Sequence, residues 1–121
     1  MQPSFHTPLV LSPNDAGTSW TLHEAFSYDS SLGTITVPAG FTTDFASVPR
    51  LFWNVLPPFG RYGKAAIVHD YLYRTRGLVS KPVADALFLE AMKALGVGTL
   101  TRYTMFLAVR LFGGSSYEGA L

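Results

Sequence analysis

Four acid–base residues lie between positions 44 and 85 of the chain. They are the carboxylates Asp44, Asp70 and Asp85 and the imidazole His69, which directly precedes Asp70. Carboxylates and imidazoles can exchange protons with a substrate or hold a divalent metal ion. These four residues are therefore the candidate catalytic residues.

The same part of the chain carries arginines, hydroxyls and tyrosines that suit an anionic ligand. Guanidinium groups match the geometry of phosphate, and aromatic rings can stack on a base. Arg61 stands at the start of a predicted helix, where a cation opposes the helix dipole but would suit a bound anion. The candidate ligand-binding residues are Ser47, Arg50, Arg61, Tyr62, Tyr73 and Arg74.

Each of these residues also has a structural interpretation. Asp44 and Ser47 could cap a short helix, and Arg61 could be an ordinary surface residue. Asp70 and Arg74, four positions apart, could form an ion pair along a helix. We predict no bound metal, because the arginines can neutralise the carboxylates, and no particular cofactor is indicated.

The second half of the chain must position most of these residues on helices. Periodicity predicts three helices, at about 62–75, from a cap at Ser80 to Gly96, and from Thr99 to about 113. Helical spacing puts His69 and Tyr73 on one face of the first helix. Its short link to the second helix implies an antiparallel pair, which can bring Asp85 near His69 or Arg74.

Asp85 itself stands on an apolar face of the second helix, with Phe88, Leu89 and Met92. A carboxylate on such a face needs a partner, because burying an unpaired charge is very costly. Asp85 could therefore bridge two helices as well as serve catalysis.

The first half of the chain is predicted to form short strands. Strands are predicted at about 8–11, 19–28 and 34–37, with a resumption at 41–43. Strands followed by helices predict an α+β fold, a small antiparallel β-sheet packed against a three-helix layer. We expect one domain over residues 1–121, with a strand-rich half at 1–50, a helical half at 51–113 and a loose tail at 114–121.

Composition excludes several classes of protein. The chain has 121 residues, 48% of them hydrophobic, so a core is expected and disorder is not. It has no cysteine, which rules out disulfides and cysteine-ligated zinc. A net charge of +1 gives no strong attraction to nucleic acid or to a membrane. The N-terminus does not resemble a signal peptide, and the longest apolar run, at 103–112, is far shorter than the roughly 20 residues that span a bilayer.

Several of these segments together resemble a bacteriophage and prophage family known as domain of unknown function 1353. The resemblance rests on the stretches 37–50, 57–62, 65–74 and 84–88, and covers about positions 37–92. Phe45 stands where leucine is expected, a mild apolar exchange. The resemblance implies a viral origin and a set of signature residues, but no reaction. That set is Asp44, Ser47, Pro49, Arg50, Gly60, Arg61, His69, Asp70, Tyr73 and Asp85.

Three functions fit these observations. The first is a protein of the host cytoplasm that binds, and in one version hydrolyses, a small anionic ligand such as a nucleotide, with a role against bacterial defences. The second is a virion component, such as a tail or baseplate accessory protein, in which the polar residues are structural and the partners are virion proteins or further copies of the chain. The third is a lysis-related cell-wall enzyme. Whether the protein is an enzyme stays open.

Overall fold

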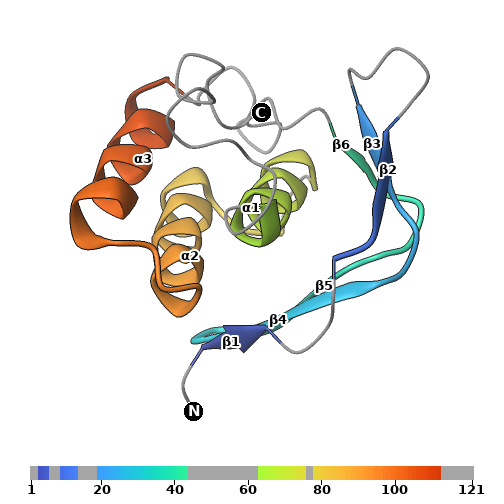
Figure 1. The fold of residues 1–121 in the computed structure, drawn as a ribbon. Helices are drawn as coiled ribbons and strands as arrows, with labels where there is room; N and C mark the ends of the chain where they lie inside the picture. Colours follow the sequence, from blue (N-terminus) through green and yellow to red (C-terminus); the bar gives the residue numbers. More distant parts are fainter. Residues whose placement is uncertain (1–2, 6–8, 14–18, 44–62, 76–77, 113–121) are drawn as a thin grey trace.

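The computed structural model describes residues 3–5, 9–13, 19–43, 63–75 and 78–112 (Figure 1). Within these residues, all the strands precede residue 44 and all the helices follow residue 62. Every strand pair is antiparallel. The predicted α+β class is therefore confirmed.

The strands form two small sheets. The first has the order β1-β4-β5, and the second has the order β2-β3-β6. The strands of the first sheet are β1 (Ser4–Phe5), β4 (Phe26–Ser30) and β5 (Gly33–Val37). Those of the second are β2 (Leu11–Pro13), β3 (Trp20–Leu22) and β6 (Thr42–Thr43).

The prediction of one strand at 19–28 in a single sheet is wrong. The chain bends after Leu22, so β3 and β4 belong to different sheets. Leu22 and Phe26 are both buried, but Glu24 between them is exposed. If the alternation continued, Glu24 would face inward, and burying its carboxylate is costly. This cost is a physical reason for the strand to end before Glu24. The strand predicted at 8–11 lies instead at Leu11–Pro13.

The three predicted helices are confirmed as α1 (Gly63–Arg74), α2 (Lys81–Ala94) and α3 (Thr99–Phe112). Helix α2 begins as expected, since the Ser80 side chain accepts a hydrogen bond from the backbone N–H of Val83. It ends at Gly96, whose φ of 80° suits a left-handed cap. The backbone N–H of Val97 then donates to the Met92 carbonyl at 3.0 Å, which closes the last turn.

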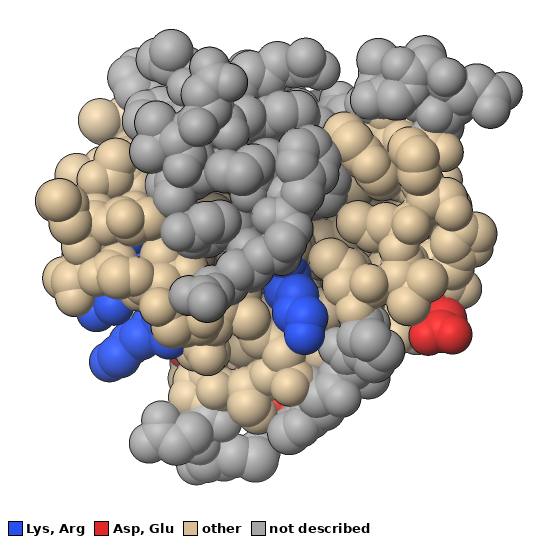
Figure 2. All heavy atoms as spheres, in the orientation of Figure 1, with Lys and Arg blue, Asp and Glu red and all other residues tan. Residues whose placement is uncertain are grey.

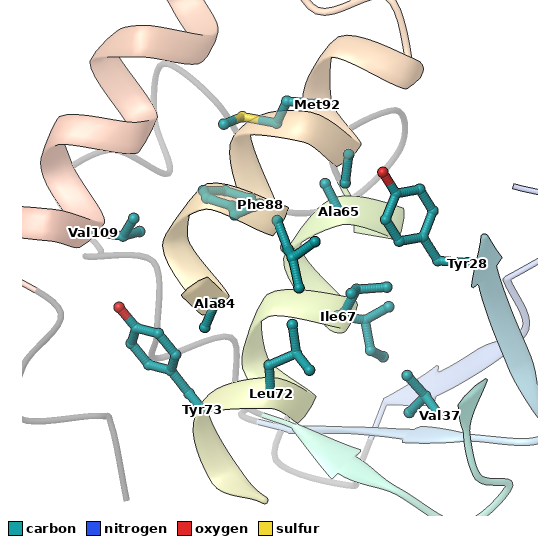
Figure 3. Close-up of a cluster of buried hydrophobic side chains, with 14 of the residues drawn as sticks. Tyr28, Val37, Ala65, Ile67, Leu72, Tyr73, Ala84, Phe88, Met92 and Val109 are labelled. Carbon is teal, nitrogen blue, oxygen red and sulfur yellow. The ribbon is translucent and has the colours of Figure 1, made fainter. Parts of the chain in front are cut away.

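Helix α1 is at the centre of the core. It contacts the strands on one side and α2 on the other, and α2 in turn contacts α3 (Figure 1). In the close-up, Tyr28 and Val37 from the first sheet lie near Ile67 of α1, with Phe88 of α2 beyond (Figure 3). Because α1 is covered from two sides, its polar residues His69 and Asp70 are also buried. Burial replaces water around the Asp70 and His69 side chains with other protein groups.

Two surface properties bear on function. Within the described segments, no helix is long and apolar enough to cross a membrane. On the face shown in Figure 2, much of the described surface is uncharged and the lysine and arginine side chains are few. The described part of that face therefore shows no broad basic surface for nucleic acid.

Candidate functional site

Two consecutive ionisable residues of α1 are buried and face different neighbours. His69 is 0% exposed and Asp70 is 1% exposed. Successive residues on a helix project about 100° apart, so the two side chains reach different elements. The partner of His69 is on α2, and Asp70 accepts a hydrogen bond from Thr43 on β6. Helix α1 therefore links two polar clusters.

The first cluster, which we call the Asp85 network, joins all three helices. One carboxylate oxygen of Asp85 is 2.8 Å from Nε2 of His69 and also accepts a hydrogen bond from the Tyr73 hydroxyl. The other accepts from Nζ of Lys81 at 2.9 Å and from Arg110 at 3.5 Å. Asp85 is fully buried, so these donors take the place of water around its charge.

The surroundings set the protonation states of this pair. Burial alone would raise the pKa of the Asp85 carboxyl, but hydrogen bonds from His69, Tyr73 and Lys81 outweigh it and lower that pKa to about 2. Burial lowers the pKa of His69 below its ordinary value, and the hydrogen bond with Asp85 offsets only part of this effect. At neutral pH, Asp85 is therefore a carboxylate and His69 a neutral imidazole. Since a carboxylate only accepts, we assign the imidazole proton to Nε2.

Lys81 extends the Asp85 network to the end of α3. Its Nζ also donates to the backbone carbonyls of Val109 and Arg110, at 3.0 and 3.2 Å. A cation is favourable at the C-terminal end of a helix, where carbonyls lack partners. Lys81 and Arg110 are not among the site residues predicted from the sequence. The four-residue spacing of Lys81 and Asp85 was a usable signal for the first, but nothing local pointed to Arg110.

The second cluster lies where β6 meets α1. Asp70 accepts from the Thr43 hydroxyl, and the exposed Arg74 donates to the Thr42 carbonyl at 3.4 Å. Among the described residues, the ion pairs within 4 Å all converge on Asp85. The predicted Asp70–Arg74 ion pair is therefore not formed, and each residue instead holds the end of β6.

The structure thus brings together His69, Tyr73 and Asp85, as helical spacing predicted, and places Asp70 and Arg74 at the end of β6. The remaining candidates and the predicted tail lie outside the described residues. That these candidates converge on one site stays a prediction. They are Asp44, Ser47, Arg50, Arg61 and Tyr62. Among the residues that are described, no three His, Asp or Glu side chains are grouped to hold a metal ion.

A third polar cluster, the Glu90 network, was not predicted from sequence. Glu90 on α2 accepts from the Tyr28 hydroxyl at 2.6 Å and from the backbone N–H of Ser31 at 3.1 Å. The Ser31 hydroxyl also donates to this carboxylate. Burial, and then the hydrogen bond with Glu90, raise the pKa of Tyr28, so its hydroxyl stays protonated. These contacts fasten α2 to the β4–β5 hairpin.

Comparison with known proteins places the sequence in a family. The model of a family described as a protein of unknown function, DUF1353, matches residues 20–109. An uncharacterised protein of Sinorhizobium fredii, y4jT, is 35% identical over 95 residues, which are 76% of this chain. The matched region is 28% of that relative's length, so the relative is much longer than the part it shares. No solved structure matches.

Proposed function

The chain belongs to the DUF1353 family of proteins of unknown function, and within that family we propose that it binds a small phosphate-bearing molecule such as a nucleotide. One observation carries the proposal. Asp70 and the exposed Arg74 of α1 meet the end of β6 at Thr42 and Thr43. The next residues along the chain, 44–62, contain the other candidates. Two of the described candidates thus lie beside the point at which the segment with the remaining candidates begins, which supports the proposal.

The Asp85 network supports a further step, hydrolysis of the ligand with His69 as the base. A general base must be unprotonated at working pH, and burial keeps His69 in that state. Asp85 orients the imidazole and sets its tautomer, as carboxylates do in acid–base pairs of hydrolases. In this step His69 takes a proton from a water molecule as the water oxygen bonds to phosphorus. The bond between phosphorus and the leaving oxygen breaks, and that oxygen departs with the electron pair and takes up a proton from water.

We also propose that the protein is encoded by a phage and acts in the host cytoplasm, where the ligand would be a nucleotide signal of a bacterial defence. This proposal is supported only by the motif resemblance and by the use that a phage has for such an activity.

Thermal melting with a panel of nucleotides and cyclic nucleotides tests ligand binding. A ligand at 100 times its Kd should stabilise the wild type by about 2.7 kcal/mol through mass action. Arg61→Ala should abolish this rise in the melting midpoint with little loss of stability in the absence of ligand. Arg102→Ala, an arginine change on α3, is the matched control and should keep the rise. If no compound shifts the wild type and both Arg61→Ala and His69→Ala unfold severely, the polar residues are structural.

A second candidate function, an accessory subunit of a virion assembly, is favoured by the outer face of α3. Leu100, Tyr103, Leu107 and Leu111 recur at spacings of three and four on this helix and are 83%, 47%, 54% and 71% exposed. An apolar stripe of this kind is typical of a contact with another protein subunit. In this function the Asp85 network only holds the helices together.

Sedimentation of the wild type and of Leu107→Glu tests this second candidate. Self-association that Leu107→Glu removes, together with the absence of any nucleotide effect on melting, would favour the assembly function. A monomer at all concentrations would count against contacts between copies of this chain.

A further inference from the structure

A pocket of about 300 Å³ is lined by none of the residues that form the three polar clusters. It runs along β5, and its lining comes from the β4–β5 hairpin, the C-terminal part of α1, the 78–79 connection and α2. Its apolar lining includes Ile35, Tyr71, Leu72, Val79 and Leu87. None of the candidates that the structure describes, His69, Asp70, Tyr73, Arg74 and Asp85, is among its lining residues.

The lining is unsuited to an ion. Among the described residues that line the pocket there is no lysine, arginine, aspartate or glutamate. Three of its four hydroxyls are already engaged in the hairpin, where Ser30 donates to the Gly33 carbonyl at 2.5 Å, Thr34 donates to Asp29 at 2.8 Å and Thr36 bonds Ser27 at 3.1 Å. The fourth is the hydroxyl of Tyr71. An ion in this pocket would therefore lose its hydration without compensation.

Two leucines are among the exposed residues of the lining, beside Gly33, Thr34 and Thr36. They are Leu32 and Leu78, which are 70% and 47% exposed. Large apolar side chains around a concave apolar surface are typical of ligand sites. The pocket also runs along an edge strand, since β5 ends the order β1-β4-β5. The outer backbone edge of β5 can offer N–H and C=O groups to one polar substituent of a ligand.

We propose that this pocket binds an uncharged, largely apolar molecule about the size of two fused aromatic rings. An apolar cavity of roughly 150 Å³ accommodates one benzene ring in another protein. A pocket of about 300 Å³ therefore suits a two-ring molecule. Burial of its apolar surface against Leu72 and Leu87 supplies the attraction, and the described lining residues carry no charge that would attract an anion.

An uncharged naphthalene dye, 6-propionyl-2-(dimethylamino)naphthalene, is a suitable probe because its emission rises and shifts to the blue in an apolar site. We expect saturable binding to the wild type. The double variant Leu32→Ser/Leu78→Ser should weaken binding by about tenfold, because both leucines border the pocket. The matched control Leu100→Ser/Leu111→Ser removes two exposed leucines from α3 and should bind within about twofold of the wild type.

Methyl NMR locates the dye independently of these variants. The chain has two isoleucines, Ile35 and Ile67, and only Ile35 lines the pocket. Dye should shift the methyl signal of Ile35 and leave that of Ile67 in place. The proposal is overturned if binding is not saturable, if both double variants weaken it equally, or if the Ile35 signal does not move. These outcomes do not depend on whether nucleotides bind elsewhere.

Discussion

Helix α2 carries two carboxylates, five positions apart, whose negative charges are compensated by different kinds of neighbours. Asp85 is enclosed and balanced by Lys81 and Arg110, with a histidine and a tyrosine as further donors. Glu90 is only partly buried and is held by the Tyr28 hydroxyl and by Ser31. Among the described residues, no cation lies within 4 Å of Glu90.

The Asp85 network contains groups that could take part in a reaction, whereas the Glu90 network only holds secondary-structure elements together. In the Asp85 network, a carboxylate orients a neutral imidazole, which is the arrangement an acid–base reaction needs. The Glu90 network contains no comparable base, and water can reach part of it. It joins α2 to the hairpin, and so helps hold the sheet against the helix on which Asp85 stands.

Removing Asp85 or Glu90 should give the largest difference between the two networks in the free energy of unfolding. Asp85→Ala leaves Lys81 and Arg110 without their carboxylate and His69 without its acceptor in a buried site, so we expect a loss of about 3 to 5 kcal/mol in the free energy of unfolding. Glu90→Ala should cost about 1 to 2 kcal/mol, since water can replace part of its contacts. Urea unfolding measures both values. Equal losses would mean that the two networks do not differ in kind. If Asp85→Ala does not fold, Asp85→Asn gives the comparison with Glu90→Gln.

Acid should break the Asp85 network within a defined pH window. The folded pKa of Asp85 is about 2, below the unfolded value of about 3.9. The stability from this depressed pKa is present above pH 4 and is lost as the pH falls towards 2, by about 2 to 3 kcal/mol in total. The pKa of His69 is also lowered, so its contribution is present above about pH 6.5 and declines below it.

Unfolding free energies measured between pH 7 and 2 would test this window. Asp85→Asn should remove the loss between pH 4 and 2, and Glu90→Gln should keep it. A wild-type curve with no change between pH 4 and 2 would show that Asp85 is not held as a carboxylate in the way described.

Replacing the tyrosine of each network with phenylalanine should give the smallest difference in the free energy of unfolding. Tyr73→Phe removes a donor from the fully buried Asp85, and we expect a loss of about 1.5 to 3 kcal/mol. Tyr28→Phe removes the matching donor from Glu90, with an expected loss of about 1 kcal/mol because that carboxylate is partly open to water. Chemical denaturation of both variants measures the pair. A larger loss for Tyr28→Phe would reverse the proposed ranking of the networks.

Much of the helical part could be predicted because its signals are local. Ser80 and Gly96 mark the ends of α2 through side-chain and backbone conformations that involve only nearby residues. His69 and Tyr73 share a face because their spacing fits one helical turn, and both contact Asp85. The strand part was harder, because alternation continues from Leu22 to Phe26 across a bend that separates two sheets.

By itself, the sequence determined the α+β class, the three helices and the common face of His69 and Tyr73, since these follow from periodicity and capping over a few residues. Only the tertiary structure decided that Arg110 reaches Asp85, that Tyr28 meets Glu90 across 62 positions, and that Asp70 binds Thr43. Such contacts depend on how whole elements pack, and local patterns carry no information about which distant side chain will fill the remaining hydrogen-bonding position of a buried carboxylate.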